Sequence, residues 1–237
     1  QHYFTPHLLT IVHVAALGWG TMIIFGAAHQ LLPVICEQDL YSEKMAASVW
    51  YTLTLGMILL TISFWNLNVG WVMIAGGSLI VISAMLYLIN VLKTSIIWKK
   101  YTIQKLFLVS SALWLLFTVI VGLLLAINLK FPFFKQSHLE ILKLHAHAGF
   151  AGWFLQLITG VSTKLVPMFL LGKSSKDNLL KWAFVFQNIG LVLFLADGYF
   201  IGVSVRVLIY TAVVLVGVVF WLLYLYDPFK NRLRKRI

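Results

Sequence analysis

Residues 106–127 read LFLVSSALWLLFTVIVGLLLAI and contain no charged side chain. An α-helix rises about 1.5 Å per residue, so about 20 consecutive apolar residues can cross the hydrocarbon core of a bilayer. Similar runs recur along the chain and predict helices at residues 8–34, 46–66, 70–92, 105–128, 141–171, 181–201 and 204–226. The runs are too long and too uniformly apolar for the strands of a membrane β-barrel. We therefore expect an all-α transmembrane helical bundle of about seven visible helices.

The composition of the chain supports the same class. Of its 237 residues, 61% are hydrophobic and 11% are charged, with a mean hydropathy of +0.94, whereas a soluble domain carries about 25% charged residues. The net charge of +11 does not indicate nucleic-acid binding, because five cations cluster in the last eight residues, directly after an apolar run. Such a cluster is typical of a cytoplasmic membrane flank. The single cysteine, Cys36, excludes an intrachain disulfide and does not identify the redox compartment.

The distribution of lysine and arginine predicts the orientation in the membrane. Cytoplasmic loops carry an excess of these residues, and seven crossings that end inside place most of them on the inner side. The inner cations are then Lys44, Lys93, Lys99, Lys100, Lys105, Lys173, Lys176, Lys181, Lys230, Arg232, Arg234, Lys235 and Arg236. The outer cations are Lys130, Lys135, Lys143 and Arg206. We expect an outside N-terminus and an inside C-terminus, in the inner (cytoplasmic) membrane of a bacterium.

Two segments of the chain resemble each other. One reads HVAALGWGTMIIFGAAHQLLP from His13 to Pro33, and the other reads HAGFAGWFLQLITGVSTKLVP from His147 to Pro167. Aligned without a gap at an offset of 134 residues, they share the pattern H-x4-G-W-x6-G-x4-L-x-P. Glycine-rich membrane helices often look alike, but the ordered histidine, Gly-Trp pair and proline favour a true repeat. A proline that closes each segment is expected to end the helix at the membrane face.

The repeat predicts the topology as well. The two segments belong to the first and fifth spans and therefore run in the same direction, which is typical of a parallel tandem repeat of four-helix units. We expect a first unit at residues 1–104 and a second at residues 105–237, the latter with the basic tail. Shifting the span 105–128 back by the same offset places its counterpart before Gln1, so a further helix is expected there.

All seven histidines lie within or just before these two segments. Histidine inside a membrane span usually marks a functional site. Since His13 and His147 are equivalent by the repeat and lie at matching depth, we expect them to be paired axial ligands of a haem iron. For His29 a packing role is the favoured alternative, and His2, His7 and His138 are expected at the outer interface. His145 points away from His147 by about 200°, so it serves either a second cofactor or a packing contact.

These residues resemble a known family. His-Ala-His opening a glycine-rich helix resembles the late haem-bearing helix of haem–copper oxidase subunit I, nitric oxide reductases and related nitric-oxide-responsive membrane proteins, and the first segment resembles the second helix of that family. The resemblance implies that His13 and His147 bind a low-spin haem and that His145 approaches a second, five-coordinate one. It covers about sixty residues well. The chain lacks the adjacent histidine pair of the copper centre and has no histidine between residues 30 and 137, so its enzymatic activity stays open.

Other residues are candidates for contacts with the haem. Arg206 and Lys143 are expected near the propionates, or else act only as topology anchors. Trp19 and Trp153 either pack on the macrocycle or fill space within the repeat. Asp197 is expected in a loop, with a proton-path acid as the alternative. No covalent Cys-x-x-Cys-His attachment motif is present, which favours haem b, one or two per chain.

We therefore expect a membrane haem protein that acts in electron transfer or binds nitric oxide or oxygen. Its expected partners are lipid, an electron-donor protein or other membrane subunits, and a diatomic gas, with no nucleic acid. A transporter built on the parallel repeat is the first alternative. Copper handling through residues such as Met45, Met168 and His29 is the last, because the six methionines are not clustered.

Overall fold

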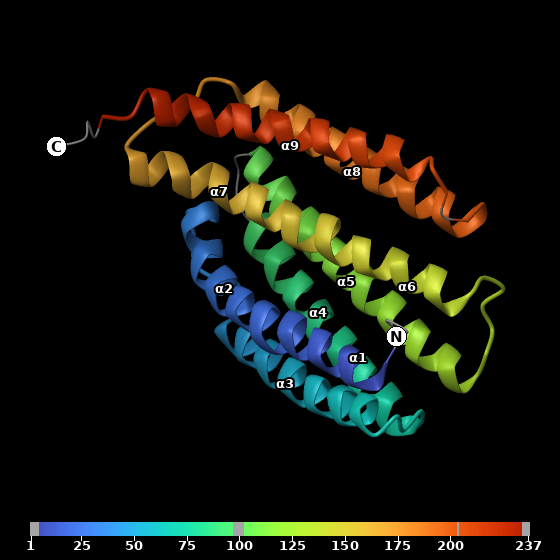
Figure 1. Ribbon diagram of the computed structural model, residues 1–237. Coiled ribbons are helices and arrows are strands. Elements are labelled where there is room, and N and C mark those ends of the chain that lie inside the picture. Colours follow the sequence, from blue (N-terminus) through green and yellow to red (C-terminus); the bar gives the residue numbers. More distant parts are fainter. Residues whose placement is uncertain (1–4, 97–101, 203, 234–237) are drawn as a thin grey trace. The chain divides into compact units, whose positions relative to one another are not determined.

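The computed structural model describes residues 5–96, 102–202 and 204–233, and throughout these ranges the regular structure is helical. Seven of its helices are long and apolar enough to cross a membrane, which confirms the predicted fold class (Figure 1). Single helices are α3 (Glu43–Trp65), α4 (Trp71–Ile96), α5 (Ile103–Lys130), α8 (Asp177–Phe200) and α9 (Val207–Lys230). His2 and the cations at 99, 100 and 234–236 lie outside the described residues.

Two of the seven spans are composite. The span Pro6–Cys36 consists of α1 (Pro6–His13), a π-helical segment η1 (Val14–Thr21) and α2 (Met22–Cys36). The span His138–Leu170 consists of α6 (His138–His147), a second π-helical segment η2 (Ala148–Phe154) and α7 (Leu155–Leu170). Both spans contain the repeated sequence pattern, so the two segments that resemble each other in sequence also share this interruption of the α-helix.

The prolines do not end these helices, contrary to the sequence-based expectation. Helix α2 continues past Pro33 to Cys36, and α7 continues past Pro167 to Leu170. Each helix instead ends at a residue with positive φ, Glu37 at 55° and Leu171 at 50°. The proline carbonyls accept the closing hydrogen bonds, from the amide of residue 38 at 3.1 Å and of residue 172 at 3.0 Å. This left-handed closure satisfies the last carbonyls, so the helix end is set one turn beyond the proline.

The chain divides into two compact units. Unit 1 comprises residues 1–98 and 116–138, and unit 2 comprises residues 99–115 and 139–237. The first half of α5 belongs to unit 2 and its second half to unit 1. Each unit holds one of the repeated segments, while the predicted boundary between residues 104 and 105 stays a prediction.

Within each unit, two helices approach closely at a glycine. In unit 1, a Cβ on Gly56 of α3 would lie 2.8 Å from the carbonyl oxygen of Gly76 in α4. In unit 2, a Cβ on Gly190 of α8 would lie 3.0 Å from the carbonyl oxygen of Tyr210 and 2.7 Å from Val214 in α9. Small residues at such crossings let membrane helices pack backbone to backbone. The paired helices α3–α4 and α8–α9 are visible in Figure 1.

The element bounds of the two units correspond at the offset of the sequence repeat. Adding 134 to the bounds of η1, α2 and α3 gives 148–155, 156–170 and 177–199, against observed bounds of 148–154, 155–170 and 177–200 for η2, α7 and α8. Gly190 follows Gly56, and the left-handed Leu171 follows Glu37, by the same 134 residues. This agreement supports the duplication, which itself stays a prediction.

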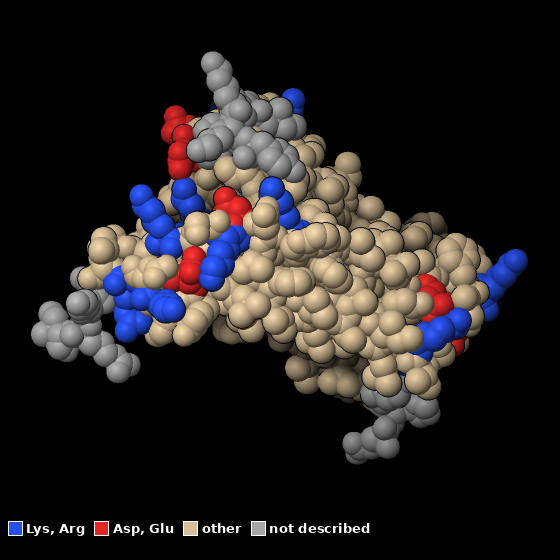
Figure 2. All heavy atoms as spheres, turned by 90° about the horizontal axis from the view of Figure 1, so that it is seen from above, with Lys and Arg blue, Asp and Glu red and all other residues tan. Residues whose placement is uncertain are grey.

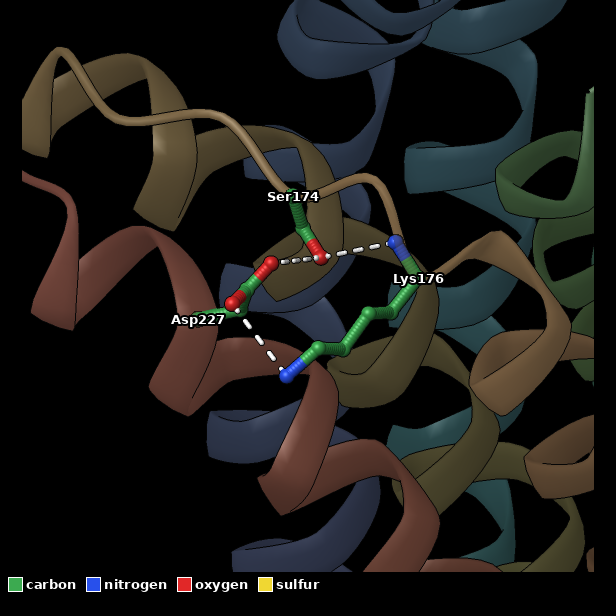
Figure 3. Close-up of polar contacts among 3 residues, drawn as sticks. All are labelled: Ser174, Lys176 and Asp227. Atoms are coloured by element: carbon green, nitrogen blue, oxygen red, sulfur yellow. Dashed lines mark hydrogen bonds and ion pairs between the residues drawn. The ribbon is translucent and has the colours of Figure 1, made fainter.

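Most charged side chains lie near the ends of the spanning helices, with Lys164 inside α7 as an exception. In α8 and α9 they lie near the helix ends, at Asp177, Lys181, Asp197, Asp227 and Lys230. Figure 2 shows a face with a broad uncharged surface between charged groups. At one end of unit 2 the carboxylate of Asp227 accepts a hydrogen bond from Ser174 at 3.0 Å and pairs with Lys176 at 3.3 Å (Figure 3). This arrangement is that of an integral membrane protein whose helices contact lipid.

Candidate haem-ligand sites

The imidazoles of His13 and His147 are held in the same way. The Nδ1 atom of His13 lies 2.8 Å from the carbonyl oxygen of Leu9, and that of His147 lies 2.7 Å from the carbonyl oxygen of Lys143. A carbonyl oxygen can only accept, so Nδ1 carries the proton in both rings. The lone pair of the neutral ring is then on Nε2, the atom that a metal would bind.

A phenylalanine of the same unit packs against each ring. The centroid of the His13 ring lies 4.9 Å from that of Phe64 in α3, with an interplanar angle of 51°. The His147 ring lies 4.6 Å from Phe194 in α8 at 48°. The backbone hydrogen bond and the aromatic neighbour together restrict the orientation of each imidazole, as second-shell groups do for metal-ligating histidines.

A π-helical segment begins directly after each of the two histidines. Segment η1 starts at Val14 and η2 starts at Ala148. Such segments are rare and occur frequently at functional sites, because they change the register of the side chains that follow. Sequence reasoning missed them, since hydropathy carries no information on whether a backbone amide bonds four or five residues back.

The two repeat tryptophans lie in different surroundings. The side chain of Trp153 is 2% exposed, whereas that of Trp19 is 72% exposed. Whether either indole packs on a macrocycle or only fills space within the repeat stays a prediction. The indole of Trp19 is open to lipid or to a bound group.

The other histidines differ in their surroundings. His29 shares the backbone anchor, with Nδ1 2.7 Å from the carbonyl oxygen of Phe25, and its ring meets Tyr87 edge-on at 5.5 Å. Its Nε2 is buried and has no hydrogen-bond partner among the described residues. His7 packs edge-on against Trp65 at 4.5 Å, and His145 is half-buried on α6. Because the residues after His29 continue as ordinary α-helix, this histidine lacks the π-helical feature of the other two.

Arg206 forms an ion pair and a hydrogen bond within unit 2. Its Nε lies 3.3 Å from a carboxylate oxygen of Asp197 and donates to the hydroxyl of Ser204 at 3.1 Å. Asp197 was expected in a loop, but it lies in the last turn of α8, since the helix continues to Phe200. A haem propionate would share Arg206 with this carboxylate. The side chain of Lys143 is exposed, and its backbone carbonyl holds His147.

A polar cluster inside unit 2 had no counterpart in the sequence analysis. The Asn188 cluster consists of Ser110, Trp114, Gln156 and Asn188. The Oδ1 atom of Asn188 accepts hydrogen bonds from Ser110 at 3.1 Å, from the Trp114 indole at 2.9 Å and from Gln156 at 2.9 Å. Its Nδ2 donates to Oε1 of Gln156 at 3.3 Å. The sequence does show an amide side chain in each of two apolar spans, Gln156 and Asn188, and such residues often mark a site. It does not show which side chains they bond to, because that depends on how the helices pack.

Each unit contains one of the two candidate axial ligands, His13 in unit 1 and His147 in unit 2. Among the described residues, no three or more histidine, cysteine, aspartate or glutamate side chains are grouped so that they could hold a metal ion together. Comparisons with protein-family models, with curated proteins and with solved structures gave no match. The case for a cofactor therefore depends on the local geometry of His13 and His147.

Proposed function

We propose that the chain is an integral membrane haem protein in which Nε2 of His13 and Nε2 of His147 are the axial ligands of one haem b. The observation that carries this proposal is the shared geometry of the two histidines. Each donates its Nδ1 proton to the carbonyl four residues earlier, at 2.8 and 2.7 Å, and each directly precedes a π-helical segment. A haem iron supplies one-electron chemistry or, with a free position, binding of a diatomic gas.

The residues fit such a group chemically. In its neutral form each imidazole presents the lone pair of Nε2, and both rings are oriented by the backbone and by a phenylalanine. The exposed indole of Trp19 offers an apolar face to a macrocycle. His145 is proposed to approach a second haem, and Arg206 to share its charge between Asp197 and a propionate.

The proposal also covers the membrane, the orientation of the chain, its family and its partners. We place the chain in the inner membrane of a bacterium, with the N-terminus outside and the C-terminus inside, on the distribution of its lysines and arginines. Relationship to the haem–copper oxidase superfamily is proposed on the two repeated segments. An electron-donor protein or further membrane subunits, and a diatomic gas, are the proposed partners.

Absorption spectra of the purified protein after haem supplementation test the proposal. The wild-type protein should show the oxidised and reduced spectra of a six-coordinate, bis-histidine haem. His13→Ala and His147→Ala should each lose that spectrum. His29→Ala is the matched control, because His29 has the same backbone anchor but no π-helical segment after it, and it should keep the spectrum. A colourless wild-type protein, or His13→Ala and His147→Ala with wild-type spectra, would contradict the proposal.

A transporter is the second candidate, and the Asn188 cluster is the observation that favours it. Amide side chains buried among apolar helices are typical of substrate paths. A substrate-dependent increase in thermal stability of haem-free protein, lost in Asn188→Leu, would support this alternative over the haem proposal.

A further inference from the structure

Within unit 2, the loop between α7 and α8 is fixed against the last turn of α9. A Cβ added to Gly172 in this loop would overlap the carbonyl oxygen of Pro228 in α9 and lie 3.0 Å from its Cα, so the contact requires a glycine. Beside Pro228, the carboxylate of Asp227 accepts from Ser174 at 3.0 Å and pairs with Lys176 at 3.3 Å (Figure 3). A close backbone contact and two polar interactions therefore hold the loop on the end of α9.

This contact brings together basic residues from two distant parts of the sequence. Lys173 follows Gly172 directly, and Lys230 and Arg232 come two and four residues after Pro228. Each of these cations is thus within a few residues of the point where the loop meets α9. Since lysine and arginine side chains are long and flexible, their charges can reach one common anion.

The carboxylates near this contact do not neutralise these cations. Asp227 is already paired with Lys176. Asp177 lies in the first turn of α8, where the helix dipole favours a carboxylate. The side chains of Lys173 and Lys230 are exposed, and neither forms an ion pair with a carboxylate of the described residues. This end of unit 2 therefore offers positive charge to an external anion.

Aromatic side chains place the cations at the level of the lipid headgroups. The guanidinium of Arg232 lies 4.3 Å from the centroid of the Phe229 ring, and Phe229 is 51% exposed. Trp182, near the start of α8, and Tyr226, near the end of α9, are also exposed. Exposed aromatic residues beside cations are typical of the membrane–water interface. One turn further into α9, the exposed Leu222 offers an apolar surface to an acyl chain.

We infer that Lys173, Lys230 and Arg232 form a binding site for the phosphate of one anionic phospholipid. Charge-assisted hydrogen bonds from the three side chains hold the phosphate, and the neighbouring apolar surface of α9 holds the acyl chains. These apolar and aromatic neighbours favour a lipid over a soluble anion. The excess of positive charge favours an anionic lipid over a zwitterionic one. The site shares no residue with the proposed haem ligands, so it stands or fails independently of haem binding.

Thermal unfolding of the full chain in neutral-detergent micelles tests the inference, because a ligand of the folded state raises the melting temperature. The reaction of the buried Cys36 thiol with a fluorescent maleimide reports unfolding. Phosphatidylglycerol should stabilise the wild-type protein at a concentration at least about tenfold lower than phosphatidylcholine does. The triple variant Lys173→Gln/Lys230→Gln/Arg232→Gln should lose this preference. About 0.5 M NaCl should weaken it in the wild-type protein, because salt screens the cations.

The matched control removes three cations elsewhere, in Lys130→Gln/Lys135→Gln/Lys143→Gln, and should keep the wild-type preference. Equal stabilisation of the wild-type protein by the two lipids overturns the inference, and so does a preference that persists in the first triple variant. If that variant does not fold, a preference of the wild-type protein that is insensitive to salt overturns the inference by itself. An equal loss in the control variant overturns the location of the site. Stabilisation by inorganic phosphate at the same concentrations as phosphatidylglycerol identifies a soluble anion as the ligand and overturns the assignment to lipid.

Discussion

At the scale of single residues, one hydrogen bond sets the chemistry of each anchored histidine. His13, His29 and His147 all donate Nδ1–H to the carbonyl four residues earlier. The bond is local to the helix, so any histidine with this rotamer can form it. What distinguishes the two candidate ligands is the backbone that follows them. The sequence repeat pairs His13 with His147, and both their equivalence and their ligation of a haem stay predictions.

The interactions of Asp227 lead to a prediction at this scale (Figure 3). Lys176 is 53% exposed at its side chain, while Asp227 is 12% exposed and also accepts from Ser174. We expect Lys176→Met to lower the free energy of unfolding by less than about 1 kcal/mol, because exposed ion pairs contribute little. Asp227→Ala should lower it by more than Lys176→Met does, because Ser174 also loses its charged acceptor. Unfolding titrations in mixed micelles would compare the two. A larger loss for Lys176→Met than for Asp227→Ala would contradict the prediction.

At the scale of elements, the helices were predictable and their interruptions were not. Hydropathy located all seven spans because each is an apolar run of sufficient length. The π-helical segments and the extension of α2 and α7 past their prolines depend on backbone hydrogen bonds, which composition does not encode. The Asn188 cluster was not predicted from the sequence for a related reason. Its members are distant in sequence, and only the packing of α5, α7 and α8 brings them together.

The close crossing of α8 and α9 gives a prediction for this pair of helices. Gly190→Ala places a methyl group 2.7 Å from Val214 and 3.0 Å from the carbonyl oxygen of Tyr210. We expect a loss of about 1–3 kcal/mol in the free energy of unfolding, because the helices must separate to admit the methyl group. Gly26→Ala is the control, since an added Cβ there has no heavy atom within 4 Å, and its effect should be below about 1 kcal/mol. Equal effects of the two substitutions, measured by the same unfolding assay, would contradict the packing argument.

At the scale of the whole molecule, the number of crossings and the charge distribution determine the expected orientation. Seven crossings would place residues 5 and 233 on opposite sides of a membrane. Charged residues at the helix ends agree with such a placement, but the side on which each end lies comes from the lysine and arginine counts alone. The sequence therefore predicts the orientation without any contribution from the packing.

Cysteine labelling measures this orientation directly. The background variant is Cys36→Ser, since Cys36 is the only cysteine and is buried. Ser204→Cys, between α8 and α9, should react with a membrane-impermeant maleimide on intact cells. Ser175→Cys, between α7 and α8, should react only after the membrane is permeabilised. Labelling in the opposite sense would reverse the proposed orientation.

The matching positions of η1 and η2 also bear on the history of the chain. If both units descend from one ancestor, the π-helical insertion was already present before the gene doubled, because it follows the histidine in both copies. The Asn188 cluster, which has methionine and threonine at two of its equivalent positions in the first copy, then belongs to one lineage only. The histidine and its π-helical segment would be the older inheritance, and the bonded amides of Gln156 and Asn188 a later divergence of the second copy.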